Sequence, residues 1–147
     1  MNLKLLKFQW LFIVITALTV ISCSDDENDV NLTGTSWQLV SMKINGEAAA
    51  LTTDQEGELL YFGANNVSYV VIPSENMNLR TAWNYDADHR ILNISDLLPV
   101  TFYVDGFSGN ELVLRNYAYA NNGKLDTFVK TYKKVETKIV DNKLQLK

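Results

Sequence analysis

Two places in the chain carry residue types that could do chemistry. Cys23, the only cysteine, lies in "VISCSDDEND" (20–29), where an apolar run meets an acidic cluster. A thiolate is a strong nucleophile, so a cysteine at such a junction is a candidate for covalent modification. His89, the only histidine, lies beside Asp86 and Asp88 in "YDADHRIL". Those three residues could form an acid–histidine pair or part of a metal site.

The cluster at His89 is better interpreted as the polar tip of a hairpin, because Asp favours turn geometry. A closed zinc site needs about four ligands, and no distant His or Cys completes one here. Glu56 and Glu58 lie beside a strand start, where we expect them to face solvent. Catalysis requires a nucleophile with a base, or paired titrating groups in a pocket. We therefore predict no catalytic, cofactor-binding or metal site, and no enzyme.

The segment before Cys23 has the form of a secretory signal peptide. Residues 10–21 are almost all apolar, and Lys4 and Lys7 precede them without any acid. As a helix the run would be about 18 Å long, whereas a bilayer core is about 30 Å thick. A basic start followed by a short apolar run is typical of a signal peptide rather than a membrane span.

The end of that run, Val20-Ile21-Ser22-Cys23, resembles the bacterial lipobox. The resemblance implies cleavage after Ser22 and lipidation of Cys23 with several acyl chains, palmitate among them. Two or more acyl chains anchor a protein stably to a membrane. The alternative is a free cysteine at the end of an ordinary signal peptide.

An acidic segment follows Cys23, beginning Ser24, Asp25, Asp26 and Glu27. A run of like charge repels itself and makes an extended, solvated linker. The same residues resemble the export tag of surface lipoproteins in some Gram-negative bacteria, and the two interpretations are compatible. We expect an outer-membrane protein at the cell surface, with a periplasm-facing position as the alternative.

Charge excludes one class of partner. Removing residues 1–22 removes Lys4 and Lys7 but no acids, so the formal charge falls from −4 to −6. Nucleic-acid binding depends on neutralising phosphates with Lys and Arg, and we expect none here. The lysine-rich end of the chain, including the polar tail 136–147, is interpreted as a solubilising surface. Contact with anionic lipid is the alternative, and the sequence identifies no protein partner.

The rest of the chain reads as short strands separated by turn residues. Several strands alternate apolar and polar residues, which is typical of an antiparallel sheet with one face on a core. Residues 67–72 are apolar on both faces, so their orientation is open, and residues 49–56 could form a turn of helix. The eight expected strands are 36–44, 58–62, 67–72, 80–86, 90–95, 100–105, 111–116 and 127–135.

Eight sequential antiparallel strands favour an up-and-down barrel, because closure removes both sheet edges. Residues 32–135 resemble the bacterial lipocalin-like lipoprotein domains in "LTGTSWQL" (32–39), "WNYD" (83–86), "NELVL" (110–114) and "YKKV" (132–135). Two residues separate Gly34 from Trp37, where true lipocalins have one. The expected organisation is signal peptide 1–22, lipidated Cys23 plus spacer 23–31, lipocalin-like all-β barrel 32–135 and tail 136–147. The competing folds are an immunoglobulin-like sandwich and the META fold, whose glycine-cysteine-asparagine core is missing.

Binding is the remaining function class, and two hypotheses stay open. In the first, a cavity lined by aromatic side chains binds a small hydrophobic ligand, as the resemblance implies. In the second, the barrel is filled and its loops, with Tyr117 and Tyr119, bind protein or glycan. An eight-stranded barrel is just wide enough to be filled or to hold one small ligand. The expected lining residues are Phe62, Tyr69, Trp83, Tyr85, Phe102 and Tyr132.

Overall fold

The computed structural model describes residues 30–95 and 100–147, which are almost entirely β-structure. In this part of the chain the one helix is a single 3₁₀ turn, η1 (Pro73–Glu75), and no helix is long and apolar enough to cross a membrane. The strands are β1 (Thr35–Ile44), β2 (Glu47–Ala49), β3 (Leu59–Phe62), β4 (Val67–Ile72), β5 (Met77–Asp86), β6 (Ile91–Ser95), β7 (Val100–Phe107), β8 (Glu111–Tyr119), β9 (Leu125–Val135), β10 (Thr137–Val140) and β11 (Lys143–Leu146).

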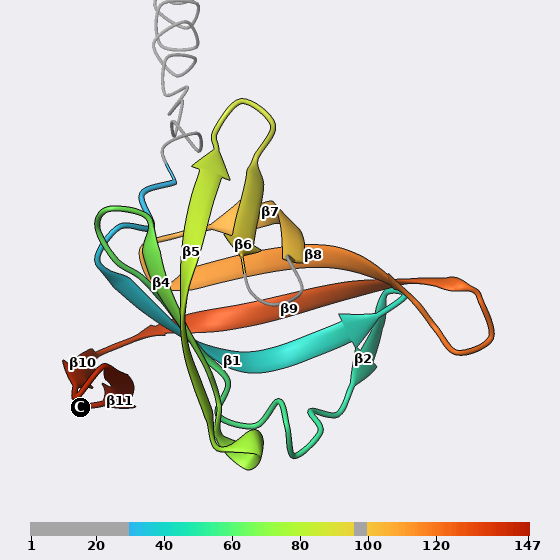
Figure 1. Ribbon diagram of the computed structural model, residues 1–147. Helices are drawn as coiled ribbons and strands as arrows, with labels where there is room; N and C mark the ends of the chain where they lie inside the picture. The colour runs from blue at the N-terminus through green and yellow to red at the C-terminus, as the bar shows by residue number, and fades with distance from the viewer. Residues whose placement is uncertain (1–29, 96–99) are drawn as a thin grey trace, which may run out of the picture.

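Eight of these strands form a closed antiparallel barrel (Figure 1). From β3 to β9 each strand pairs with the next, and β1 pairs with β3 on one side and with β9 on the other. The closing register runs from Ser36 opposite Val135 to Ile44 opposite Phe128, with a bulge between Leu39 and Ser41. β2 is a short addition that folds back on the end of β1. The expected fold class, an eight-stranded up-and-down barrel, is confirmed.

Asparagine makes several of the tight connections between the strands. Asn45 and Gly46 join β1 to β2, and Asn65 and Asn66 join β3 to β4, all with positive φ. Asparagine and glycine tolerate this left-handed conformation better than other residues, which is why these dipeptides specify hairpins. The segment that could have been helical, 49–56, makes an isolated turn in which the Glu56 amide donates to the Thr52 carbonyl over 3.0 Å.

One end of the barrel interior is filled by large aromatic rings. Trp37 and Phe107 lie 5.8 Å apart between ring centroids, and Phe62 and Trp83 lie 5.1 Å apart. We call these four residues the aromatic floor. Both indole N–H groups are satisfied locally, since Trp83 donates to the Gly63 carbonyl over 3.0 Å and Trp37 to the hydroxyl of Thr35 over 2.8 Å. The aromatic floor therefore packs one end of the barrel interior.

A second, smaller core lies outside the barrel, where the hairpin of β10 and β11 packs through β11 against β4 and β5. Leu144 of β11 is 2% exposed and packs in a cluster with Leu59 and Tyr69. The side chain of Asn78 holds the hairpin by accepting from the Leu144 amide over 3.1 Å and donating to its carbonyl over 2.9 Å. Residues 136–147, expected from the sequence to be only a polar, solubilising tail, form these two strands. Their packing explains why residues 67–72 are apolar on both faces.

We expect Leu144→Ala to lower the free energy of unfolding by about 2–4 kcal/mol, the usual cost of truncating a buried leucine. Leu146→Ala is the matched control, because that side chain is 46% exposed in the same strand, and it should change stability by less than about 0.5 kcal/mol. Urea unfolding of both variants is the measurement. Equal, small effects would show that the hairpin is not part of the folded unit.

Candidate ligand-binding cavity

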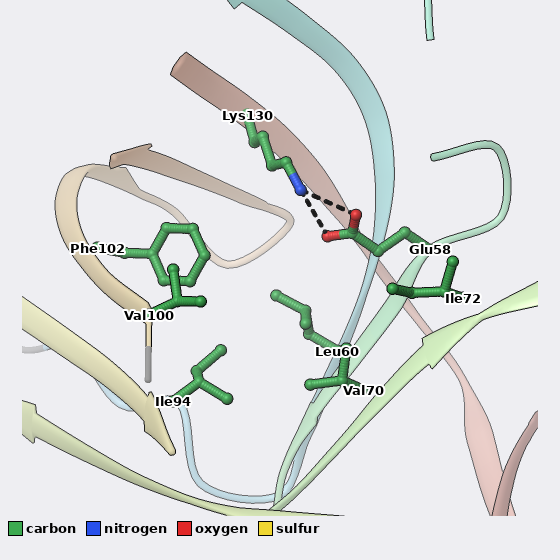
Figure 2. A pocket seen from close by; sticks show the side chains of 8 residues that line it. All are labelled: Glu58, Leu60, Val70, Ile72, Ile94, Val100, Phe102 and Lys130. Atoms are coloured by element: carbon green, nitrogen blue, oxygen red, sulfur yellow. Dashed lines mark hydrogen bonds and ion pairs between the residues drawn. The ribbon is translucent and has the colours of Figure 1, made fainter. Parts of the chain in front are cut away.

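The barrel interior is hollow on the side away from the aromatic floor. A cavity of about 170 Å³ lies there, with walls drawn from β3, β4, β6, β7 and β9. Six of its lining side chains are apolar and two are charged (Figure 2). The apolar residues come from alternate positions that the strand register turns inward: Leu60, Val70, Ile72, Ile94, Val100 and Phe102.

The charged pair, Glu58 and Lys130, lies on one side of this apolar wall (Figure 2). The ammonium of Lys130 donates to both carboxylate oxygens of Glu58, at 2.8 and 3.1 Å. Tyr132 donates its hydroxyl to Oε1 of Glu58 over 2.6 Å. The side chains of Lys130 and Glu58 are only 18% and 9% exposed. Pairing is needed here, since an uncompensated charge in such a site is strongly destabilising.

The strand architecture explains how both charges reach the interior. Lys130 is two residues from Tyr132 on β9, so both side chains point to the same face of the strand. Glu58 precedes β3 directly, two residues before Leu60, which also faces inward. The expectation that Glu58 faces solvent is therefore wrong, because the residue is 7% exposed. Lys130, grouped with the solubilising lysines, also points inward. The spacing in "FVKTY" was the sequence signal that could have identified it.

The six aromatic residues that were expected to line a cavity lie in different parts of the structure. Phe102 lines the cavity. Phe62 and Trp83 belong to the aromatic floor. Tyr85 is half-buried and packs against the main hydrophobic core of the barrel. Tyr132 is fully buried and contributes its hydroxyl to the charged pair.

Tyr69, the sixth of these residues, lies outside the barrel. Its ring packs in the outer cluster with Leu59 and Leu144 and lies 6.2 Å from the ring of Tyr61. Its neighbour Val70 faces the cavity instead. Side chains of β4 thus alternate between the cavity and the outer cluster, an orientation that the sequence left open because both faces of the strand are apolar.

The cluster at His89 forms the polar tip of the β5–β6 hairpin. Asp86 accepts from the backbone N–H groups of Asp88 and His89, and its carboxylate lies 2.7 Å from Nδ1 of His89. The hydrogen bond from the His89 side chain lowers the pKa of Asp86 below its ordinary value. Within residues 30–95 and 100–147, no three His, Cys, Asp or Glu side chains are grouped as a metal site would require.

An exposed aromatic patch lies on the outer face of β7 and β8. The guanidinium of Arg115 lies over the rings of Tyr103 and Tyr117, 5.0 and 5.3 Å from their centroids, and pairs with Asp105 at 2.9 Å. Tyr117 is 43% and Tyr119 77% exposed. We call Tyr103, Arg115, Tyr117 and Tyr119 the tyrosine patch. Tyr117 and Tyr119, which the second binding hypothesis placed in a loop, therefore lie on strand β8 instead and are accessible.

The residues of the expected lipid anchor, Cys23 and Ser24 to Glu27, lie outside the described residues. The same holds for the signal peptide at 1–22 and for most of the spacer at 23–31. The expected lipidation and export tag remain predictions from the sequence.

No family model matches the sequence, and no curated protein matches it significantly. Among solved structures, the chain is similar to bovine odorant-binding protein, a lipocalin, in complex with a selenium-containing odorant: 15% identity, 75% of this chain and 76% of that one, TM-score 0.47. The complex of the same protein with undecanal gives 14% identity, 71% and 72% coverage, and a TM-score of 0.46. The eight-stranded antiparallel barrel follows from this chain's own strand pairing.

Alkaline pH should destabilise the fold through Tyr132. Burial first, and then the adjacent carboxylate of Glu58, raise the pKa of this hydroxyl well above its usual value of 10.0. Above pH 10 the unfolded chain therefore loses a proton that the folded chain keeps. The protonated Tyr132 hydroxyl makes its full contribution to the free energy of unfolding below pH 10. Above pH 10 that free energy should fall by up to about 1.4 kcal/mol per pH unit.

The variant Tyr132→Phe should remove this part of the alkaline loss, at the cost of the hydrogen bond to Glu58. Urea unfolding between pH 9 and the onset of alkaline denaturation is the measurement. Tyr119→Phe is the control, because that side chain is 77% exposed and should leave the slope unchanged. Identical slopes in wild type and Tyr132→Phe would contradict the assignment.

Proposed function

We propose that this protein is a lipid-anchored outer-membrane lipoprotein of a Gram-negative cell surface, whose barrel binds a small hydrophobic molecule without catalysis. The observation that carries the binding role is the cavity of about 170 Å³ with six apolar lining residues. Ligand sites are typically concave and apolar, with a few placed polar groups. The pair of Glu58 and Lys130 supplies such groups here.

The size of the cavity fits a small ligand. A dry cavity of about 150 Å³ suffices to bind benzene in another protein, and typical pockets for drug-sized molecules are about 300–1,000 Å³. The cavity of about 170 Å³ therefore suits a molecule with a single ring or a short chain. Such a molecule would contact Leu60, Val70, Ile94 and Phe102, which lie around the hollow (Figure 2).

The anchoring part of the proposal is supported by the sequence around Cys23. A short apolar run, a small residue at Ser22 and the only cysteine occur in the order that lipidation requires. The acidic residues that follow would keep the barrel at a distance from the bilayer. Anchored in this way, the barrel could take up apolar molecules at the cell envelope.

A second candidate function uses the outer surface instead of the cavity. The tyrosine patch presents rings and a guanidinium on a rigid sheet, with Tyr119 77% exposed. Tyrosine and arginine are enriched where proteins bind other macromolecules, because they give large contact area at low entropic cost. In this alternative the barrel is a display module for protein or glycan contacts.

Binding of toluene, an apolar ring of suitable size, tests the cavity. In the full chain held in lipid nanodiscs, toluene should shift the labelled methyl resonances of Ile72 and Ile94, which line the cavity, saturably. The exposed Ile139 should report no change. Val70→Phe fills the hollow and should abolish the shifts, whereas Val40→Phe, at an exposed position, should not. If neither toluene nor 1-hexanol binds in the cavity, the tyrosine patch becomes the candidate binding site.

The anchor is tested by Cys23→Ser, expressed in a Gram-negative host that displays surface lipoproteins. Labelled palmitate should be incorporated into the wild type and not into the variant, which should also leave the outer-membrane fraction. Replacing Asp25, Asp26 and Glu27 by their amides should preserve lipidation and abolish cleavage by protease added to whole cells. Palmitate on the serine variant would refute Cys23 as the lipid site.

A further inference from the structure

The pair of Glu58 and Lys130 in the cavity is electrically neutral without a ligand. The carboxylate of Glu58 takes two hydrogen bonds from Lys130 and one from Tyr132. One positive and one negative charge therefore cancel within an apolar wall. A ligand that enters this site meets strong hydrogen-bonding groups but no net charge.

Hydrogen-bonding capacity nevertheless remains on the cavity side. An ammonium group has three N–H donors, and among the described residues Lys130 donates only to the two oxygens of Glu58. A third N–H is thus available to an acceptor in the cavity, whose lining includes Lys130. A hydrogen bond from a charged donor is about twice as strong as a neutral one.

Charge balance decides which head group gains from that donor. A ligand carboxylate would bring a second negative charge beside Glu58, leaving two carboxylates to share one ammonium. A ligand ammonium would be repelled by Lys130, because both groups carry a positive charge. Each case buries an unpaired charge, which is the costly situation in a site of low polarity. A neutral oxygen accepts from Lys130 without changing the balance.

We propose that the Glu58–Lys130 pair makes this site selective for short neutral amphiphiles that carry one hydrogen-bond-accepting oxygen, such as alcohols or ketones. This inference rests on the proposed ligand-binding function and specifies its ligand class. The apolar part lies against Leu60, Val70, Ile94 and Phe102, and the oxygen accepts from Lys130. Glu58 acts as a built-in counter-ion that rejects free carboxylates.

Three probes with one six-carbon chain and different heads test the selectivity: 1-hexanol, hexanoate and hexylammonium at neutral pH. Affinity is read from the methyl shifts of Ile72 and Ile94 in the full chain in nanodiscs, which separates cavity binding from partition into lipid. Hexanol should bind at least about tenfold more tightly than either ion, a factor equivalent to 1.4 kcal/mol.

The variant Glu58→Gln removes the built-in counter-ion and leaves Lys130 charged. Hexanoate should then gain at least about tenfold relative to hexanol, because it replaces the missing charge. Glu111→Gln is the matched control, since Glu111 forms the exposed pair with Lys133 at 2.7 Å on the outer surface. It should leave all three affinities unchanged. The double variant Glu58→Gln/Lys130→Met, without either charge, should again prefer hexanol.

The outcomes separate the two proposals. Equal binding of hexanol and hexanoate to the wild type, or an unchanged preference in a folded Glu58→Gln variant, would overturn the selectivity while leaving ligand binding intact. If Glu58→Gln does not fold, the comparison of the three probes on the wild type still decides. Failure of toluene and all three six-carbon probes would overturn both proposals.

Discussion

Pairing of β1 with β9 is the constraint on which the rest of the structure depends. It closes the sheet along the register from Ser36–Val135 to Ile44–Phe128 and so removes both barrel edges. It also places β3 and β9 on the two sides of β1. Glu58, just before β3, and Lys130, on β9, therefore meet inside the barrel although 72 positions separate them in the sequence.

The closed barrel divides its interior between a packed end and a hollow. Large rings fill the end near Trp37 and Phe62, where they pack closely within the main hydrophobic core. Towards the other end, branched aliphatic side chains and the charged pair leave a hollow. A buried ion pair is a weak source of stability compared with apolar packing of the same volume. Its position in the cavity wall is consistent with the proposed selection of neutral ligands.

The outer cluster shows why hydrophobic alternation alone was insufficient for β4. Val70 and Ile72 face the cavity, whereas Tyr69 and Val71 face the hairpin of β10 and β11. Both faces of this strand are therefore buried, and no polar face indicates its orientation. An exposed strand with this composition would be an aggregation hazard, and the buried Leu144 covers it.

The sequence by itself determined the eight barrel strands, most of their turns and the up-and-down order, because hydrophobic alternation and turn residues such as Asn, Asp and Gly act over a few residues. It also predicts a lipid anchor at Cys23, a prediction that depends only on local residue order. The sequence did not assign Tyr69 to the outer cluster, structure to residues 137–146, or Glu58 and Lys130 to the interior. Only the tertiary structure decided these, because each depends on contacts between residues far apart in the chain. The charged pair is the clearest case, since neither residue has a reason to be buried until barrel closure supplies its partner.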